Sequence, residues 1–184
     1  KFSAKFSNKT GFTYTKMYYD MDMNLAPHLM QPLELISEGK GNTDLISAYT
    51  SSSIGLSDQV TLNVGINVQV LTLNNSWVLE PRAGVKWQAS PKSSFALAYG
   101  LHSRMEKMDV YFVKTQGTGD RSVNKDLDFT KAHHVMLSYG FKVSDNMNVK
   151  IEPYFQYLYD VPVIADSSYS VLNRRDFYVE DALV

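Results

Sequence analysis

The sequence contains no cysteine and almost no excess of charge of either sign, and both absences exclude classes of function. Without a thiol, the chain can form no disulfide framework and has no thiolate for chemistry. Its 18 Lys and Arg residues nearly balance 19 Asp and Glu residues, which gives a formal net charge of −1. The basic field that attracts nucleic acid or anionic lipid is therefore missing, and we expect no nucleic-acid partner.

Long apolar runs are also missing. Because no stretch of 18 consecutive apolar residues occurs, the sequence predicts no transmembrane helix. A length of 184 residues is enough for one domain. The chain begins Lys1-Phe2-Ser3, which is neither a start methionine nor a signal peptide, so we expect a processed or cut chain.

Helical periodicity is hard to find, and an alternation of apolar and polar residues takes its place. Over Val60–Asn75, the even positions from 60 to 70 are all aliphatic, whereas the odd positions from 61 to 69 are polar or glycine. The same period of two recurs in four further segments: 76–90, 94–105, 135–143 and 149–159. With two less regular strands near 6–23 and 42–57, the sequence predicts an all-β protein, an antiparallel up-and-down meander of seven long strands.

The predicted connections are of two kinds. Three are short and carry Asp or Pro directly after Ser, which is turn chemistry: 57–59, 90–93 and 144–146. The longer, polar ones lie at 24–41 and 114–130, with a third long segment from Ala165 onward; the tight Asn74-Asn75 link is the exception. Short turns at one end and long loops at the other are typical of a bacterial outer-membrane barrel.

Three features favour a membrane barrel over a soluble β-sheet protein, which also alternates apolar with polar residues. Several alternating runs reach 12 residues or more, whereas globular strands average about 5–6 and a tilted membrane strand needs about 9–11. Each strand has two alternating sets of residues, an apolar phase and a polar phase. The polar phase is rich in small neutral residues such as Gly65, Ala98 and Gly100. Aromatic residues gather near strand ends, as Trp77 and Trp87 do, which is typical of aromatic girdles.

Charges decide which phase would face lipid. Arg82 and Lys86 share one phase, and each cation at mid-bilayer would cost about 2–4 kcal/mol, so that phase is predicted to face the lumen. The predicted lumen-facing residues, which would meet a plug or a translocation path, are Asn63, Asn67, Gln69, Glu80, Arg82, Lys86, His102, Arg104, Lys150 and Glu152. The predicted lipid-facing residues are Val64, Ile66, Val68, Val85, Trp87, Leu97, Tyr99, Leu137, Tyr139 and Phe155. Lys16 lies in the lipid phase and is expected to reach the interface by snorkelling.

The pattern predicts no enzyme, no cofactor and no metal. Ser and Asp are plentiful, but nothing arranges a nucleophile with a base and a third group. Four His are present without a close-spaced ligand pair, and His133 and His134 point to opposite faces. Glu80 and Arg82 either contact a plug or line a polar path, or they simply pair within a solvated interior. The loops at 24–41 and 114–128 are the candidates for ligand recognition.

Four segments resemble the barrel of TonB-dependent outer-membrane receptors of Bacteroidetes, of the type with a carboxypeptidase-regulatory-like domain. They are LEPRAGVKW (79–87), SFALAYGLHSR (94–104), LDFTKAHHVMLSYGF (127–141) and YFQYLYDVPV (154–163), and SVLN (170–173) fits the loop that follows. The resemblance implies a plugged 22-stranded barrel in the bacterial outer membrane, which imports a bulky nutrient or chelate with energy from the TonB complex.

The plug, the TonB-contacting segment and the remaining strands are not found in the sequence. Residues 1–184 are therefore expected to be an internal piece of the barrel, since an odd number of strands leaves edges that lipid cannot satisfy. The expected partners are outer-membrane lipid, the plug of the same parent chain and the TonB complex through the missing N-terminal region, and a lid lipoprotein is left open. The alternative is a small complete outer-membrane barrel, or a lipocalin-like barrel whose apolar phase faces inward around a hydrophobic ligand.

Overall fold

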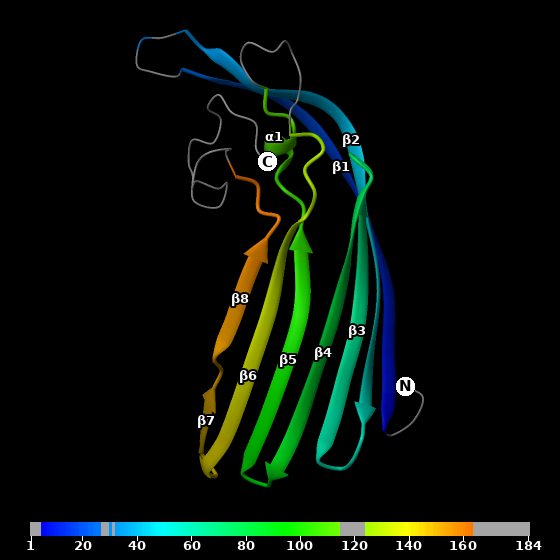
Figure 1. Cartoon of the computed structure of the whole chain (residues 1–184), viewed down its shortest axis with the longest axis vertical. Helices are drawn as coiled ribbons and strands as arrows, with labels where there is room; N and C mark the ends of the chain where they lie inside the picture. The colour runs from blue at the N-terminus through cyan, green and yellow to red at the C-terminus, as the bar shows by residue number, and fades with distance from the viewer. Residues whose placement is uncertain (1–4, 27–29, 31, 115–123, 164–184) are drawn as a thin grey trace.

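A computed structural model describes residues 5–26, 30, 32–114 and 124–163, and these form one antiparallel sheet and one short helix (Figure 1). In chain order the elements are β1 (Phe6–Leu25), β2 (Glu34–Gly55), β3 (Val60–Leu71), β4 (Ser76–Ser90), β5 (Ser93–Arg104), α1 (Met108–Tyr111), β6 (Thr130–Ser144), β7 (Met147–Ile151) and β8 (Tyr154–Tyr159). From β1 to β7 each strand pairs with its neighbour in sequence. The predicted all-β, up-and-down meander is confirmed.

The structure has eight strands where the sequence predicts seven, because the predicted strand at 149–159 is divided. Both β7 and β8 pair with β6, and they do so in one register: Tyr139 pairs with Ile151, and Met136 pairs with Tyr154. Pro153 lies between the two segments. Since proline has no N–H to donate, the ladder is interrupted there although the strand continues in the same line.

The first two strands are longer than predicted, and the predicted loop at 24–41 is wrong. β1 has 20 residues and β2 has 22, and their ladder continues up to Leu25 opposite Glu34. β3 pairs with β2 only from Leu45 to Gly55. Residues 16–25 and 34–44 therefore form a two-stranded arm, which bends over the upper end of the sheet in Figure 1.

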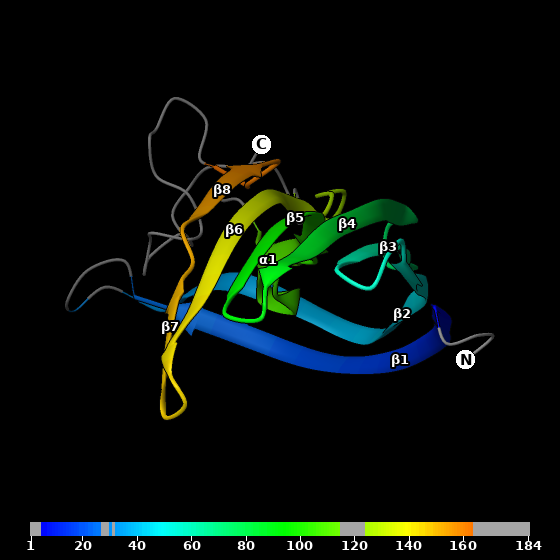
Figure 2. The same ribbon diagram turned by 90° about the horizontal axis from the view of Figure 1, so that it is seen from below.

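The sheet is curved into a trough, and it is not closed. Figure 2, which looks along the strands, shows the ribbon bending around the space that contains α1. Within the described residues, β1 pairs only with β2, and β7 and β8 pair only with β6. The sheet thus has a concave face and a convex face and two free edges.

The main buried cluster lies at the upper end of the concave face. Leu71 and Val78 of the sheet pack there with Tyr111, Phe112 and Phe129 from the connection between β5 and β6. This connection was predicted only as a loop, and its helix was not foreseen. Below the cluster no second layer covers the described part of the sheet, so most of both faces stays accessible.

The β5–β6 connection is fixed to the arm by several contacts. The ring of Phe112 lies 4.7 Å from that of Tyr19 between centroids, and it occupies the space above Gly39, where a Cβ would come within 2.8 Å of the ring. Val113 forms a β-bridge with Ser37, and the N–H of Lys114 donates to the carbonyl of Ile36 at 2.7 Å. The arm and α1 therefore form one packed unit above the trough.

Candidate functional site

The register assigns each of the two predicted sets of residues to one face of the sheet. Cross-strand partners share a face, and one row joins Val64 to Tyr99 and Phe155 through Ala83 and Val135. The convex face carries the residues predicted to meet lipid: Val64, Ile66, Val68, Val85, Trp87, Leu97, Tyr99, Leu137, Tyr139 and Phe155. The residues predicted to face a lumen share the concave face. Contact with lipid or with a lumen stays a prediction.

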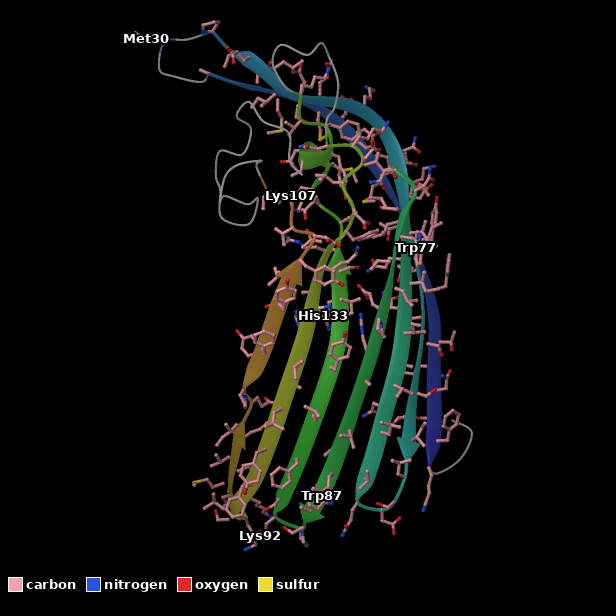
Figure 3. All side chains as sticks on the ribbon, in the orientation of Figure 1. Met30, Trp77, Trp87, Lys92, Lys107 and His133 are labelled. Carbon is pink, nitrogen blue, oxygen red and sulfur yellow. The ribbon has the colours of Figure 1, made fainter. Side chains whose placement is uncertain are left out.

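The convex face is apolar and accessible over most strands. Large side chains in its middle, such as Ile66, Leu97 and Leu137, are 39% to 50% exposed. Near the tight turns, the rings of Trp87, Phe95 and Tyr139 follow one another across three strands, 5.7 Å and 4.8 Å apart. Figure 3 shows Trp87 near the lower end of the sheet and Trp77 at the upper end.

A second aromatic group lies higher on the convex face, around His133. Its Nδ1 is 2.8 Å from the hydroxyl of Tyr99, and its ring stacks on that of Tyr159 at 5.0 Å. The ammonium group of Lys16, farther along the face, lies 5.7 Å from the Tyr18 ring. Aromatic and amphipathic side chains thus bracket the aliphatic middle of the convex face.

The concave face is polar, and its centre is the carboxylate of Glu80, which is 2% exposed. Donors from three strands surround it: the amides of Asn67 and Gln69 at 2.9 and 3.0 Å, the N–H and hydroxyl of Ser103, both at 2.7 Å, and Nη2 of Arg82 at 2.8 Å. Ser47 of β2 extends the network to a fourth strand by donating to Asn67 at 2.8 Å. A buried carboxylate with this many donors is a well-satisfied ion.

Pro81 explains why this carboxylate lies between β4 and β5. On β4, pairing with β5 begins at Arg82, opposite Gly100. The preceding residue is Pro81, which has no N–H for a ladder. Above this point β4 pairs only with β3, and β5 pairs only with β6. Figure 1 shows β4 and β5 separating toward their upper ends. The Glu80 side chain enters the opening and accepts the N–H of Ser103, which a strand carbonyl would otherwise accept.

A groove of about 400 Å³ lies beside the network on the concave face. Its floor is made of small residues, Gly65, Gly84, Ala98 and Gly100, and its polar side chains include Arg82, His102 and His134. The two imidazole rings are 4.7 Å apart between centroids. A Cβ at position 100 would lie 2.8 Å from Nε2 of His102, so the glycine makes room for this ring.

The other predicted lumen-facing residues lie apart from the groove or at its rim. Asn63 lines the groove. Arg104 is 3.9 Å from the buried Glu106 at the upper end, and Lys150 pairs with Glu152 at 2.7 Å at the edge of the sheet. Lys86 lies on β4 opposite Thr61 and Ala96. The structure therefore brings together Asn67, Gln69, Glu80, Arg82 and His102, and leaves these others outside the cluster.

The contact between His102 and His134, the role of Ser103 and the packed helix were not predicted from the sequence. The rings of His102 and His134 meet because β5 and β6 are neighbours, whereas 32 positions separate the two in sequence. Ser103 was missed because its N–H and hydroxyl reach Glu80 across the gap between β4 and β5, a contact that no local pattern shows. The only sequence signal for the packed helix is the apolar run Val110-Tyr111-Phe112-Val113 inside a polar stretch.

The described residues contain no group of three or more His, Asp or Glu side chains that could hold a metal ion. His102 and His134 are a pair without a third ligand of this kind. Most of the loop predicted at 114–128, the segment from Ala165 with SVLN, and His28 lie outside the described residues.

Comparison with protein-family models, with curated proteins and with solved structures found no match to the chain. Among the described residues, no helix combines the length and the apolar character needed to cross a membrane.

Proposed function

We propose that this sheet is part of the wall of an outer-membrane β-barrel, and that the parent protein is a TonB-dependent transporter for a bulky nutrient or chelate. The observation that carries the proposal is the division between the two faces. The convex face exposes aliphatic side chains between aromatic groups, whereas the concave face holds a saturated polar network around Glu80. Apolar outside and polar inside is the arrangement of a membrane barrel, since lipid replaces the packed core.

The free edges support a larger barrel. An exposed row of backbone N–H and C=O groups costs several kcal/mol per group in hydrocarbon, so edges must be paired in a membrane. β1 and the line of β7 and β8 would each pair with a further strand of the parent chain. In this proposal the sheet itself catalyses nothing, and the energy for import comes from the TonB complex through a plug.

Spin labels test the face assignment. Because the sequence has no cysteine, the variants Ile66→Cys and Asn67→Cys can carry a nitroxide label in the parent protein reconstituted in lipid vesicles. The label at 66 is expected to collide with oxygen, which concentrates in lipid, and the label at 67 is expected to collide with it much less. Equal oxygen collision rates would contradict the membrane wall, and a reversed pattern would favour the lipocalin-like alternative.

The transporter identity is tested by the parent gene. A plug-coding region should lie upstream, and a run of strands ending in an aromatic residue should lie downstream. A stop codon directly after Val184 would favour a small complete barrel.

A further inference from the structure

We propose that the concave groove binds the phosphate group of a small solute between Arg82, His102 and His134. The proposal goes beyond the wall function, and rests on it only for the statement that the groove opens into a barrel interior.

Arg82 keeps N–H donors for a ligand at the groove. A guanidinium group has five N–H donors, and Arg82 uses Nη2 to bond Glu80. The Glu80 carboxylate already accepts four other hydrogen bonds, from Asn67, Gln69 and Ser103. Glu80 therefore anchors the guanidinium through one of its five N–H groups, and the Arg82 side chain remains 49% exposed at the groove.

Two histidines add donors beside Arg82. His102 and His134 come from adjacent strands, and each imidazole can present at least one N–H to the groove. Their rings lie 4.7 Å apart, and neither makes a hydrogen bond to another side chain of the described residues. Among the polar residues that line the groove there are three basic side chains and no carboxylate. The three oxygens of a phosphate group can accept hydrogen bonds from the guanidinium and from both imidazoles, whereas a carboxylate has only two oxygens to share among them.

The groove has room for a phosphate group. Gly65, Gly84 and Gly100 lower the floor of the groove, and about 400 Å³ is ample for a phosphate group with part of the molecule attached to it. A Cβ at position 100 would meet Nε2 of His102 at 2.8 Å and Cγ of Arg82 at 3.6 Å. The glycine thus allows the imidazole and the guanidinium to approach the same region.

Titration calorimetry of inorganic phosphate into the purified parent protein in detergent, at constant ionic strength, tests the site. We expect Arg82→Met to weaken phosphate binding about tenfold or more, because a charge-assisted bidentate contact is lost. His102→Asn and His134→Asn should each weaken it severalfold, and Gly100→Ala should weaken it without any change of charge. Arg82→Lys, which retains the charge, should fall between Arg82→Met and the unchanged protein.

Lys9→Met is the matched control. Lys9 is an exposed cation in the same cross-strand row as Gly65 and Arg82, but it lies on β1, beside the groove-lining Ser51, and does not itself line the groove. Its removal should leave phosphate binding unchanged. Absence of phosphate binding in the unchanged protein would overturn the proposal, and so would equal weakening by Lys9→Met and Arg82→Met, which would indicate general charge attraction. Phosphate binding alongside equal oxygen collision at positions 66 and 67 would contradict the membrane wall and leave the anion site standing.

Discussion

The backbone N–H of Leu137 donates to the carbonyl of Pro153 at 3.1 Å, and proline has no N–H with which to return a bond. This one-sided pair interrupts the last strand between β7 and β8, although both segments continue in a single register on β6. The strand is divided because Pro153 has no N–H, and not because the chain changes direction there.

Pro153→Ala is expected to restore the missing ladder bond and to join β7 to β8. The free energy of unfolding should rise by about 0.5–1.5 kcal/mol, the net value of one hydrogen bond. Guanidinium unfolding of the purified protein measures the change. Pro91→Ala, in the turn between β4 and β5, is the control and should give no gain, and an equal rise in both variants would contradict the explanation.

Ile66→Arg is expected to reduce the amount of folded protein in the outer membrane, because a cation on a lipid-facing strand costs about 2–4 kcal/mol at mid-bilayer. Asn67→Arg, one residue further on the concave face, should be tolerated. The measurement is the amount of each folded variant in isolated outer membranes. Similar amounts of the two folded proteins would argue against the assignment of the convex face to lipid.

Glu80→Ala is expected to lower the free energy of unfolding by about 2–3 kcal/mol, because it leaves the buried donors of Ser103, Asn67 and Gln69 without their acceptor. The loss stays below that of a fully buried ion pair, since Arg82 is half exposed and can be hydrated. Glu80→Gln retains a carbonyl acceptor and should cost less. Denaturant midpoints of the unchanged protein, Glu80→Gln and Glu80→Ala should decrease in that order. An unchanged midpoint for Glu80→Ala would mean that the network does not hold β4 and β5 together.

Tyr111 is expected to make stability depend on pH in the alkaline range. Burial above the trough raises its pKa from 10.0 to about 12. Below pH 10 the phenol is neutral whether the chain is folded or unfolded, whereas between pH 10 and pH 12 the unfolded chain ionises first. Stability should therefore fall through this window, as unfolding midpoints at pH 9 and pH 11.5 would show.

Tyr111→Phe is the matching control for the alkaline effect, because it keeps the ring and removes the ionising group. It also removes the acceptor of the Glu106 N–H, 3.2 Å away, so its stability at neutral pH should be slightly lower. The decline between pH 10 and pH 12 should be smaller in this variant. An identical decline in both proteins would assign the effect to other tyrosines.

The sequence by itself determined the fold class and the two faces of the sheet. In a strand, successive side chains point to opposite sides, so a period of two fixes which residues share a face before any pairing is known. The series from Val60 to Val70 and the charges of Arg82 and Lys86 are enough to distinguish an apolar face from a polar one. Neighbouring strands joined by short turns then pair in order, and the register preserves this division.

The tertiary structure decided the features that depend on contacts between distant residues or on the direction of a backbone group. The sequence shows Pro81 and Pro153, but only the arrangement of neighbours tells which strand loses a donor at each. The β2 half of the arm, residues 34–44, has no regular alternation, and the ladder of the arm is supported by packing of Tyr19 against Phe112. The meeting of His102 with His134, and of Glu80 with Ser103, requires strands to be placed side by side. These contacts come from pairing across the sheet, which a local pattern does not encode.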